Sequence, residues 1–350
     1  MTKKIVVLPG DGIGPEVTAQ AVKVLTRVGK KFELSFLFEY GLIGAAAIDK
    51  TGAALPDETL RLCADADAVL LGAVGDPKFD NDPSAKVRPE QGLLGIRKAL
   101  GLFANIRPIT TYPLLYNTSP LKENLLEGVD LLVYRELTGG IYFGQKGRRD
   151  NGQIAFDDCI YSIHEIERIS HLAFGAARSR KKHLTLVDKA NVLETSRLWR
   201  DTVKKIAAEY PDVKVDYLFV DAASMKLVQF PAFFDVILTE NMFGDILTDE
   251  ASVITGSIGM LPSSSIGTDK ALFEPIHGSY PQAAGKNIAN PFGTILSAAM
   301  LLDYLNLPQA AQSVKQAVIK ALQNGKVTID INPNHYIGTE EAGSWISENI

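Results

Sequence analysis

The apolar and polar positions of this chain follow two periods, one typical of strands and one typical of helices. Residues 5–8 form a short continuous apolar run of the kind that a buried strand shows. After a turn over residues 9–15, apolar side chains recur at the spacing of one helix face: Val17, Ala21, Val24 and Val28. The chain is therefore predicted to begin with a strand, a tight turn and a helix.

The same alternation continues along the chain. Further β-type runs, with helical patterns between them, occupy residues 32–38, 67–74, 103–109, 130–135, 183–188, 215–220 and 234–238. Pro56, followed by Asp57 and Glu58, marks one helix start, because acidic side chains in a first turn suit the helix dipole. Strands that alternate with helices predict an α/β fold with much parallel sheet.

Residues 139–157 depart from this alternation. Two β-like pieces flank the turn signal Asn151-Gly152, and they carry the apolar side chains Ile141, Tyr142, Phe143, Ile154 and Phe156. An isolated hairpin with apolar strands is only marginally stable unless something covers it. We therefore expect an arm that contacts a second copy of the chain.

Length, composition and charge narrow the class of protein. A chain of 350 residues suits about two domains, and 46% hydrophobic with 22% charged residues excludes a disordered or collagen-like chain. The net charge of −5 argues against nucleic acid and membrane partners. Cys63 and Cys159 form no disulfide framework, and the first apolar run is too short for a signal peptide. We expect a cytoplasmic protein.

The turn over residues 9–15 resembles a dinucleotide fingerprint, but its glycine spacing is wrong. Gly10, Gly12 and Gly14 run GxGxG rather than GxGxxG, and Pro15 removes a backbone donor at the helix start. We therefore expect a non-Rossmann fold, in which this tight turn brings its backbone close to some ligand.

Carboxylates supply the strongest local signal for chemistry. Asp245 and Asp249 are four residues apart and would share one helix face, where two like charges repel unless a cation joins them. Asp221 ends another predicted strand, at the sheet edge where α/β proteins place functional groups. Oxygen ligands suit Mg²⁺ or Mn²⁺. A solvated acidic face is the alternative for the pair alone.

Basic and aromatic side chains at element ends add further candidates. Lys189 follows a strand, and Asn191 with Glu194 looks like a helix cap that would lower the pKa of the lysine and let it accept a proton. The guanidinium groups that could bind carboxylates belong to Arg97, Arg107 and Arg135. The alternatives are surface ion pairs for these cations and a core position for Tyr142. The loop over residues 274–291 is long enough to wrap a ligand.

Taken together and in this order, these segments resemble the isocitrate/isopropylmalate dehydrogenase family of β-decarboxylating dehydrogenases. The resemblance covers nearly the whole chain and is most specific at residues 8–16, 135–142, 241–249 and 256–263. Residues 88–97 resemble the isopropylmalate branch, because Leu93 and Leu94 would line an apolar pocket for an isopropyl group. A γ-carboxylate against the same pair would be left desolvated and unpaired.

The resemblance implies two α/β domains around a cleft, each with its own role. Residues 1–102 with 256–350 would form a discontinuous cofactor-binding domain. Residues 103–255 would form the dimerisation and metal/substrate domain, with an arm over residues 139–157. The family forms each active site across a homodimer.

The resemblance also assigns roles to single residues. Arg97, Arg107 and Arg135 would bind the malate carboxylates, and Asp221, Asp245 and Asp249 would bind Mg²⁺ or Mn²⁺. Lys189 would be the general base, coming with Asp221 from the partner subunit, and Tyr142 would deliver the final proton. The residues implied for the cofactor are Ile13, Gly75, Asp76, Pro77, Glu274, His277, Gly278, Ser279, Gln282 and Asn290, with Glu90 near the nicotinamide.

One departure from the family pattern concerns the nucleotide. Many NAD-using relatives have Ala and Asp where this chain has Tyr280 and Gln282, and NADP-using relatives have Lys-Tyr at residues 282 and 283. Because no cation is gained here, the pattern favours NAD.

The activity implied is the oxidative decarboxylation of (2R,3S)-3-isopropylmalate to 4-methyl-2-oxopentanoate and CO₂ with reduction of NAD⁺, a step of leucine biosynthesis. A related substrate (tartrate, homoisocitrate or isocitrate) is the alternative within the family. A non-catalytic regulatory paralogue is the alternative outside enzymes, although such a chain is expected to lose one or more of Tyr142, Lys189, Asp245 and Asp249, which are all present.

Overall fold

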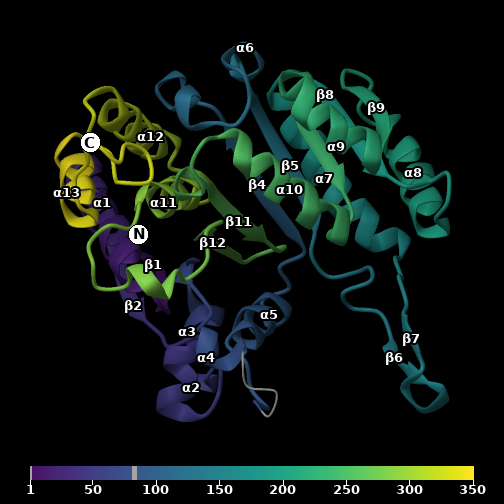
Figure 1. Cartoon of the computed structure of the whole chain (residues 1–350), viewed down its shortest axis with the longest axis horizontal. Coiled ribbons are helices and arrows are strands. Elements are labelled where there is room, and N and C mark those ends of the chain that lie inside the picture. Colours follow the sequence, from purple (N-terminus) through teal and green to yellow (C-terminus); the bar gives the residue numbers. More distant parts are fainter. Residues whose placement is uncertain (1, 81–84) are drawn as a thin grey trace. The chain divides into compact units, whose positions relative to one another are not determined.

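A computed structural model describes residues 2–80 and 85–350 and forms two compact units (Figure 1). Unit 1 comprises Met1–Leu102 and Ser257–Ile350, and unit 2 comprises Phe103–Gly256. Each unit has its own strands, helices and apolar core, so the α/β prediction is confirmed twice in one chain. No helix among the described residues is both long and apolar enough to cross a bilayer.

The strands of unit 1 lie in the order β2-β1-β3-β12-β11. Their bounds are β1 Lys3–Gly10, β2 Phe36–Tyr40, β3 Ala68–Ala73, β11 Pro262–Ile266 and β12 Ala271–Pro275. All neighbours are parallel except β11, which runs antiparallel to β12. All six residues of β3 are buried, which explains why it reads as a continuous apolar run.

Eight α-helices accompany these strands among the described residues of unit 1. They are α1 Gly14–Phe32, α2 Ala45–Thr51, α3 Asp57–Asp65, α4 Pro77–Asp80, α5 Glu90–Ala99, α11 Phe292–Tyr304, α12 Pro308–Gln323 and α13 Thr339–Glu348. The predicted strand over residues 32–38 is wrong at its start, because the apolar face of α1 continues to Phe32. The helix then ends at Glu33 in a left-handed conformation (φ 55°), and β2 begins only at Phe36.

The strands of unit 2 lie in the order β4-β5-β10-β8-β9, all parallel except β4. They are β4 Ala104–Thr110, β5 Asp130–Glu136, β8 His183–Asp188, β9 Lys214–Phe219 and β10 Val236–Thr239. In the register, Thr239 of β10 lies between Arg135 of β5 and Val187 of β8. The carboxyl ends of these three strands therefore bring Arg135, Lys189 and the start of the next helix to one edge of the sheet.

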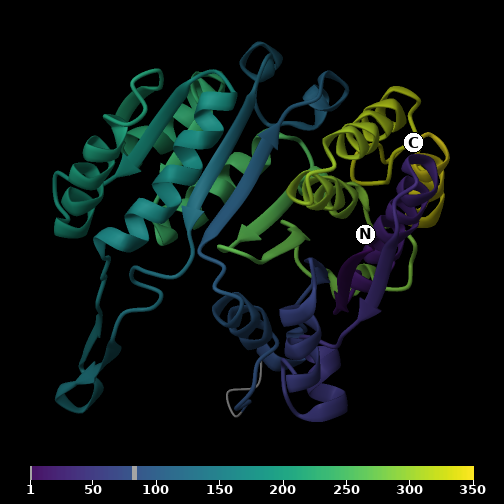
Figure 2. The ribbon, with the colours of Figure 1, turned by 180° about the vertical axis from the view of Figure 1, so that it is seen from behind.

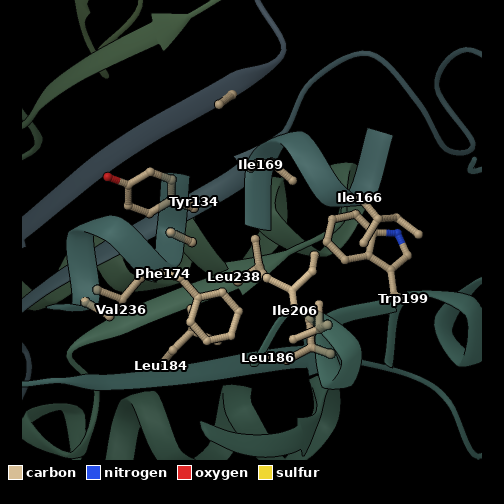
Figure 3. Packing of buried hydrophobic residues seen from close by; sticks show 14 of the residues in the cluster. Tyr134, Ile166, Ile169, Phe174, Leu184, Leu186, Trp199, Ile206, Val236 and Leu238 are labelled. Atoms are coloured by element: carbon tan, nitrogen blue, oxygen red, sulfur yellow. The ribbon is translucent and has the colours of Figure 1, made fainter. Parts of the chain in front are cut away.

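Helices cover both faces of this sheet. They are α6 Glu123–Leu126, α7 Ile163–Ser179, α8 Glu194–Ala207, α9 Val220–Gln229 and α10 Asn241–Ile254. Alternate residues of β8 and β10 (Leu184, Leu186, Val236 and Leu238) pack under α7 and α8 around Phe174 and Trp199 (Figure 3). The α9–α10 pair lies on the opposite face of the sheet (Figures 1 and 2).

The predicted hairpin is present, but its first strand is not the apolar one. Strands β6 (Lys146–Arg149) and β7 (Ile154–Asp157) pair antiparallel around Asn151, whose φ is 55°. The expected strand at Ile141–Phe143 is instead a turn, in which the Phe143 and Gly144 N–H groups donate to the carbonyl of Gly140. Gly140 has a φ of 78°, and a Cβ there would lie 2.4 Å from the Tyr161 hydroxyl, so this segment bends.

Candidate active site

The residues predicted to act are divided between the two units. Unit 2 contains Arg107, Arg135, Tyr142, Lys189, Asp221, Asp245 and Asp249. Unit 1 contains Ile13, Gly75, Asp76, Pro77, Glu90, Leu93, Leu94, Arg97, Glu274, His277, Gly278, Ser279, Gln282 and Asn290. Each group forms its own constellation.

In unit 2, Asp245 and Asp249 share one face of α10, as their spacing predicts. Asp245 accepts a hydrogen bond from the Arg135 guanidinium and another from the Tyr142 hydroxyl, the latter at 3.0 Å. Asp249 accepts from Arg107 Nη1 at 3.2 Å. Two guanidinium groups thus face two carboxylates, an arrangement that can bind a cation through the acids and an anion through the arginines.

Tyr142 is not a core aromatic, because 42% of its surface is exposed. Partial burial raises the pKa of its phenol, and the hydrogen bond to Asp245 and the charge of that carboxylate raise it further. The phenol therefore stays protonated at neutral pH and can act as a proton donor.

Asn241, a residue that sequence reasoning did not single out, holds this constellation together. Its Oδ1 accepts from Arg135 Nε at 3.1 Å and from Nη2 at 2.9 Å, and its Nδ2 donates to the carbonyl of Gly139 at 3.2 Å. Its backbone N–H donates to the Tyr161 hydroxyl at 2.9 Å. One buried amide therefore links the arginine to the turn that carries Tyr142.

Lys189 and Asp221 form a second constellation in unit 2. Lys189 follows β8, Asp221 lies in the first turn of α9, and Lys189 Nζ is 2.5 Å from Asp221 Oδ1. The hydrogen bond from Lys189 is the main cause of a lowered pKa at Asp221.

The predicted cap beside Lys189 is wrong. Helix α8 begins at Glu194, and Leu193 rather than Asn191 precedes it, without a side-chain cap. The carbonyl of Lys189 instead accepts the N–H groups of Val192 and Leu193, which closes a turn between strand and helix. Lys189 is thus removed from the helix N-terminus, and its ammonium faces a carboxylate.

These two constellations do not combine within one chain. No group of three metal-ligating side chains gathers anywhere in the part of the chain that the structure describes. Asp245 and Asp249 form an oxygen-only pair that suits a hard cation, while Asp221 faces Lys189. The two acids of α10 fit Mg²⁺ or Mn²⁺ chemically but leave the ligand set incomplete.

In unit 1, a cavity of about 400 Å³ opens beside the turn that follows β1. It is lined by Ile13, Ile258, Gly259, His277, Gly278, Tyr280, Ile288, Ala289, Asn290, Ile329 and Asp330. His277 Nε2 is buried and has no hydrogen-bond partner among the described residues, while Nδ1 lies 3.0 Å from the carbonyl of Gly278. Burial lowers the pKa of His277, so the neutral ring has one nitrogen left for a ligand.

The glycine-rich turn packs tightly against the loop around Ser279. The Ile13 N–H donates to the Ser279 carbonyl at 2.8 Å, and a Cβ at Gly12 would lie 2.0 Å from that oxygen. Asp11, which is buried, accepts three N–H groups from two separate segments: those of Ala45 and Ala46 at the start of α2, and that of Gly75. The close approach of the turn after β1 to the loop around Ser279 thus explains why glycine recurs in the GxGxG segment.

The other predicted residues of unit 1 lie around this turn or on α5. A Cβ at Gly75 would be 3.3 Å from Glu90 Oε1 and 3.5 Å from Ser279 Oγ, so these three residues share one surface. Asp76 and Pro77 lead into α4. Arg97 pairs with Glu274 at 2.7 Å.

Leu93, Leu94 and Gln282, the remaining predicted residues of unit 1, differ in burial. Leu93 packs against the core of unit 1, whereas 51% of Leu94 is exposed. Gln282 is exposed and does not line the cavity.

Asp330 is a second residue that the sequence did not indicate. It lines the cavity and accepts from Asn290 Nδ2 at 3.0 Å, from the Ser257 hydroxyl at 2.5 Å and from the Thr328 hydroxyl at 2.6 Å. Asn290 Oδ1 also accepts the Phe292 N–H at 2.9 Å, although α11 begins at Phe292 and the residue directly before it is Pro291 rather than Asn290. The cavity thus has mostly apolar walls, with the polar side chains of His277, Asn290 and Asp330 among its lining residues.

A sequence profile described as isocitrate/isopropylmalate dehydrogenase matches residues 4–346. This chain belongs to that family. A protein named 3-isopropylmalate dehydrogenase from Bacteroides fragilis (strain YCH46) is 55% identical over 352 residues, which is 100% of this chain and 99% of the relative. One of the same name from Clostridium acetobutylicum is 53% identical and covers 98% of each chain.

Solved structures show the family fold as well. A crystal structure of isocitrate dehydrogenase from Methylococcus capsulatus has a TM-score of 0.88 and 36% identity, and it covers 99% of both chains. An apo β-decarboxylating dehydrogenase from Thermococcus kodakarensis has a TM-score of 0.82 and 38% identity, with 99% of this chain and 96% of that one covered. The predicted fold class, a member of the isocitrate/isopropylmalate dehydrogenase family, is confirmed.

Replacing Asn241 of this dehydrogenase by alanine should destabilise unit 2. The change leaves the Gly139 carbonyl and two Arg135 donors without their buried partner, at a cost of about 1–3 kcal/mol in the free energy of unfolding. The midpoint of urea unfolding should fall accordingly. Asn334→Ala, at an exposed loop position, is the control, and an equal midpoint for both variants would contradict this role.

Proposed function

We propose that this chain oxidises and decarboxylates (2R,3S)-3-isopropylmalate to 4-methyl-2-oxopentanoate and CO₂ with NAD⁺ as hydride acceptor, as a step of leucine biosynthesis in the cytoplasm. The observation that carries the proposal is 55% identity over the full length to relatives named for this substrate. The apolar surface of α5 supports it, because exposed Leu94 lies three residues from Arg97 on one helix face. Such a face suits an isopropyl group beside a carboxylate.

Unit 2 would hold the divalent cation and the reacting groups. Asp245 and Asp249 would bind Mg²⁺ or Mn²⁺ together with Asp221 of the partner subunit. When bound, the cation supplies positive charge for the 2-hydroxyl, its neighbouring carboxylate and the enolate that remains as CO₂ leaves. Arg107 and Arg135, which now pair with Asp249 and Asp245, would bind substrate carboxylates once the cation takes over these acidic partners.

Two groups would move protons. Lys189 would accept the proton of the 2-hydroxyl while the hydride leaves C2. After the bond to CO₂ breaks and its electron pair forms the enolate, Tyr142 would donate a proton to C3, which completes the product. The hydrogen bond from the Tyr142 hydroxyl to Asp245, at 3.0 Å, supports this assignment, because it holds the phenol beside a proposed ligand of the cation.

Unit 1 would bind the dinucleotide. The unpartnered Nε2 of His277 offers a hydrogen bond inside a cavity that is otherwise largely apolar, which fits a nucleotide. Ile13, Gly75 and the loop from Glu274 to Asn290 would contact the cofactor, with Glu90 at the nicotinamide end. Gln282 adds no cation for a 2′-phosphate, so NAD⁺ is the expected cofactor.

A homodimer would complete the active site. Exposed apolar side chains line α9 and α10 at helical spacing: Met225 and Val228 on α9, and Ile246 and Val253 on α10. Each is between 45% and 58% exposed in the single chain. Such a patch on packed helices is typical of a protein–protein interface, and Asp221 and Asp245 flank it on the same two helices.

Placing a charge in this patch should therefore separate the subunits. Val253→Glu would bury an unpaired carboxylate in the interface, which is costly enough to shift the protein towards monomers. Light scattering after size exclusion should show half the wild-type mass, with activity lost because Lys189 and Asp221 of the partner subunit are missing. Ile319→Glu on α12 is the control. A wild-type monomer, or a Val253→Glu variant of unchanged mass, would refute the dimer proposal.

A spectrophotometric assay of NADH formation tests the whole proposal. The purified chain should reduce NAD⁺ with 3-isopropylmalate when Mg²⁺ or Mn²⁺ is added, and not after chelation. Tartrate, homoisocitrate and isocitrate should be poorer substrates, and NADP⁺ a poorer acceptor. A higher kcat/KM with a γ-carboxylate substrate than with 3-isopropylmalate would show that Leu93 and Leu94 do not form an isopropyl pocket. No turnover with any of these acids would favour the regulatory paralogue.

A further inference from the structure

Tyr280 lies in the wall of the unit 1 cavity, and the proposed reaction gives it no role. It lines the cavity and keeps 55% of its surface exposed. Its hydroxyl has no hydrogen-bond partner among residues 2–80 and 85–350. A large ring held at a cavity wall without a polar partner has its flat face available for contact with a ligand.

The backbone fixes where the Tyr280 side chain leaves the loop. Tyr280 has a φ of 38°, in the left-handed region that residues with a Cβ rarely adopt. The conformation is imposed from both sides, because the Ser279 carbonyl accepts the Ile13 N–H and the Tyr280 carbonyl accepts the Ala283 N–H. An unfavourable conformation that the surroundings enforce is often found where a side chain must be presented to a ligand.

The rest of the cavity has the properties of a site for a planar heteroaromatic ring. Ile13 and Ala289 belong to one buried apolar cluster, with Ile288 packed against it, so this wall is firm. Apart from Tyr280 itself, the polar side chains of the lining are those of His277, Asn290 and Asp330. Flat apolar surfaces combined with a few hydrogen-bonding groups match a purine base better than a ribose or a phosphate.

We propose that Tyr280 stacks on the adenine ring of the dinucleotide, so that this chain holds the adenosine half through its base. The assignment deepens the proposed function and rests on it for the identity of the cofactor. Tyr280 is thus a binding residue and takes no part in the transfer of hydride.

Calorimetric titration with adenosine monophosphate tests this proposal, with neither substrate nor metal present. Tyr280→Ala should raise the Kd for this nucleotide at least about fivefold, the loss expected when one base loses an aromatic partner. Tyr280→Phe keeps the ring and should stay within about twofold of the wild type. Tyr40→Ala, an equally exposed tyrosine on β2 outside this cavity, should leave the Kd unchanged.

Two further readouts separate stacking from general damage. The Tyr280→Ala variant should bind nicotinamide mononucleotide as the wild type does, and in the assay its KM for NAD⁺ should rise while kcat is retained. Equal binding of adenosine monophosphate by wild type and Tyr280→Ala, equal losses in the Phe and Ala variants, or no saturable binding by the wild type would overturn the proposal. None of these outcomes depends on 3-isopropylmalate being the substrate, so a failure here is distinct from failure of the proposed activity.

Discussion

Replacing Lys189 by methionine is expected to lower kcat by at least about a hundredfold, and by up to about 10⁴-fold. The proposed role of Lys189 is to take the hydroxyl proton as the hydride leaves, and a positioned general base contributes about 10²–10⁴ in rate. Methionine has a similar length but cannot accept a proton. Steady-state rates at saturating substrate and NAD⁺ measure the effect.

The fold should tolerate this change. The Lys189–Asp221 ion pair is exposed, with 27% and 62% of the side-chain surfaces accessible, and exposed pairs contribute little to stability. The urea midpoint and the KM for NAD⁺ should therefore stay close to wild type. Lys205→Met on α8 removes an exposed lysine by the same substitution and serves as the control. A kcat within tenfold of the wild type would remove Lys189 as the base.

Replacing Asp245 by asparagine is expected to weaken Mn²⁺ binding by at least about a hundredfold. The loss of a group that only orients a metal ligand typically costs about 10–100-fold in affinity, and the loss of a charged ligand should cost more. Asparagine is nearly isosteric: its Oδ1 can still accept the hydrogen bond of Arg135, and its Nδ2 can donate to the Tyr142 hydroxyl oxygen, so the fold should survive. Electron paramagnetic resonance of free Mn²⁺, with and without 3-isopropylmalate, gives the affinity.

A matched loss of one carboxylate separates ligation from general electrostatics. Glu348→Gln removes one negative charge from the exposed end of α13 and should leave the Mn²⁺ isotherm unchanged. If Asp245→Asn bound Mn²⁺ as tightly as this control, Asp245 could not be a ligand.

Local periodicity was enough to predict most of the framework. The strand over residues 183–188 coincides with β8, and the i,i+4 spacing of Asp245 and Asp249 correctly predicts one shared helix face. Both depend on backbone geometry alone, which repeats every two residues in a strand and every 3.6 in a helix. Lys189 and Arg135 could likewise be placed at strand ends from the pattern of apolar runs.

Contacts between distant segments set the limit of prediction. Asn241 bonds to Arg135 and Gly139, which are more than a hundred residues away in the sequence, and Asp330 bonds to Asn290, forty residues away. No local sequence pattern encodes such hydrogen bonds. The false cap at Asn191 shows the opposite error. There a plausible local signal was overridden by a turn that the carbonyl of Lys189 closes with Val192 and Leu193.

Lys189 pairs with Asp221, which lies on α9, whereas Asp245 lies on α10 and pairs with Arg135. This separation has a genetic consequence. If each centre takes Lys189 from one subunit and Asp245 from the other, then Lys189→Met and Asp245→Asn carry complementary lesions. In a mixed dimer both lesions fall in one centre, and the other centre is intact. Random reassortment makes about half of the dimers mixed, so two inactive preparations blended in equal amounts should regain about a quarter of the wild-type rate. Two alleles that each abolish growth without leucine would then restore it when they are expressed in the same cell.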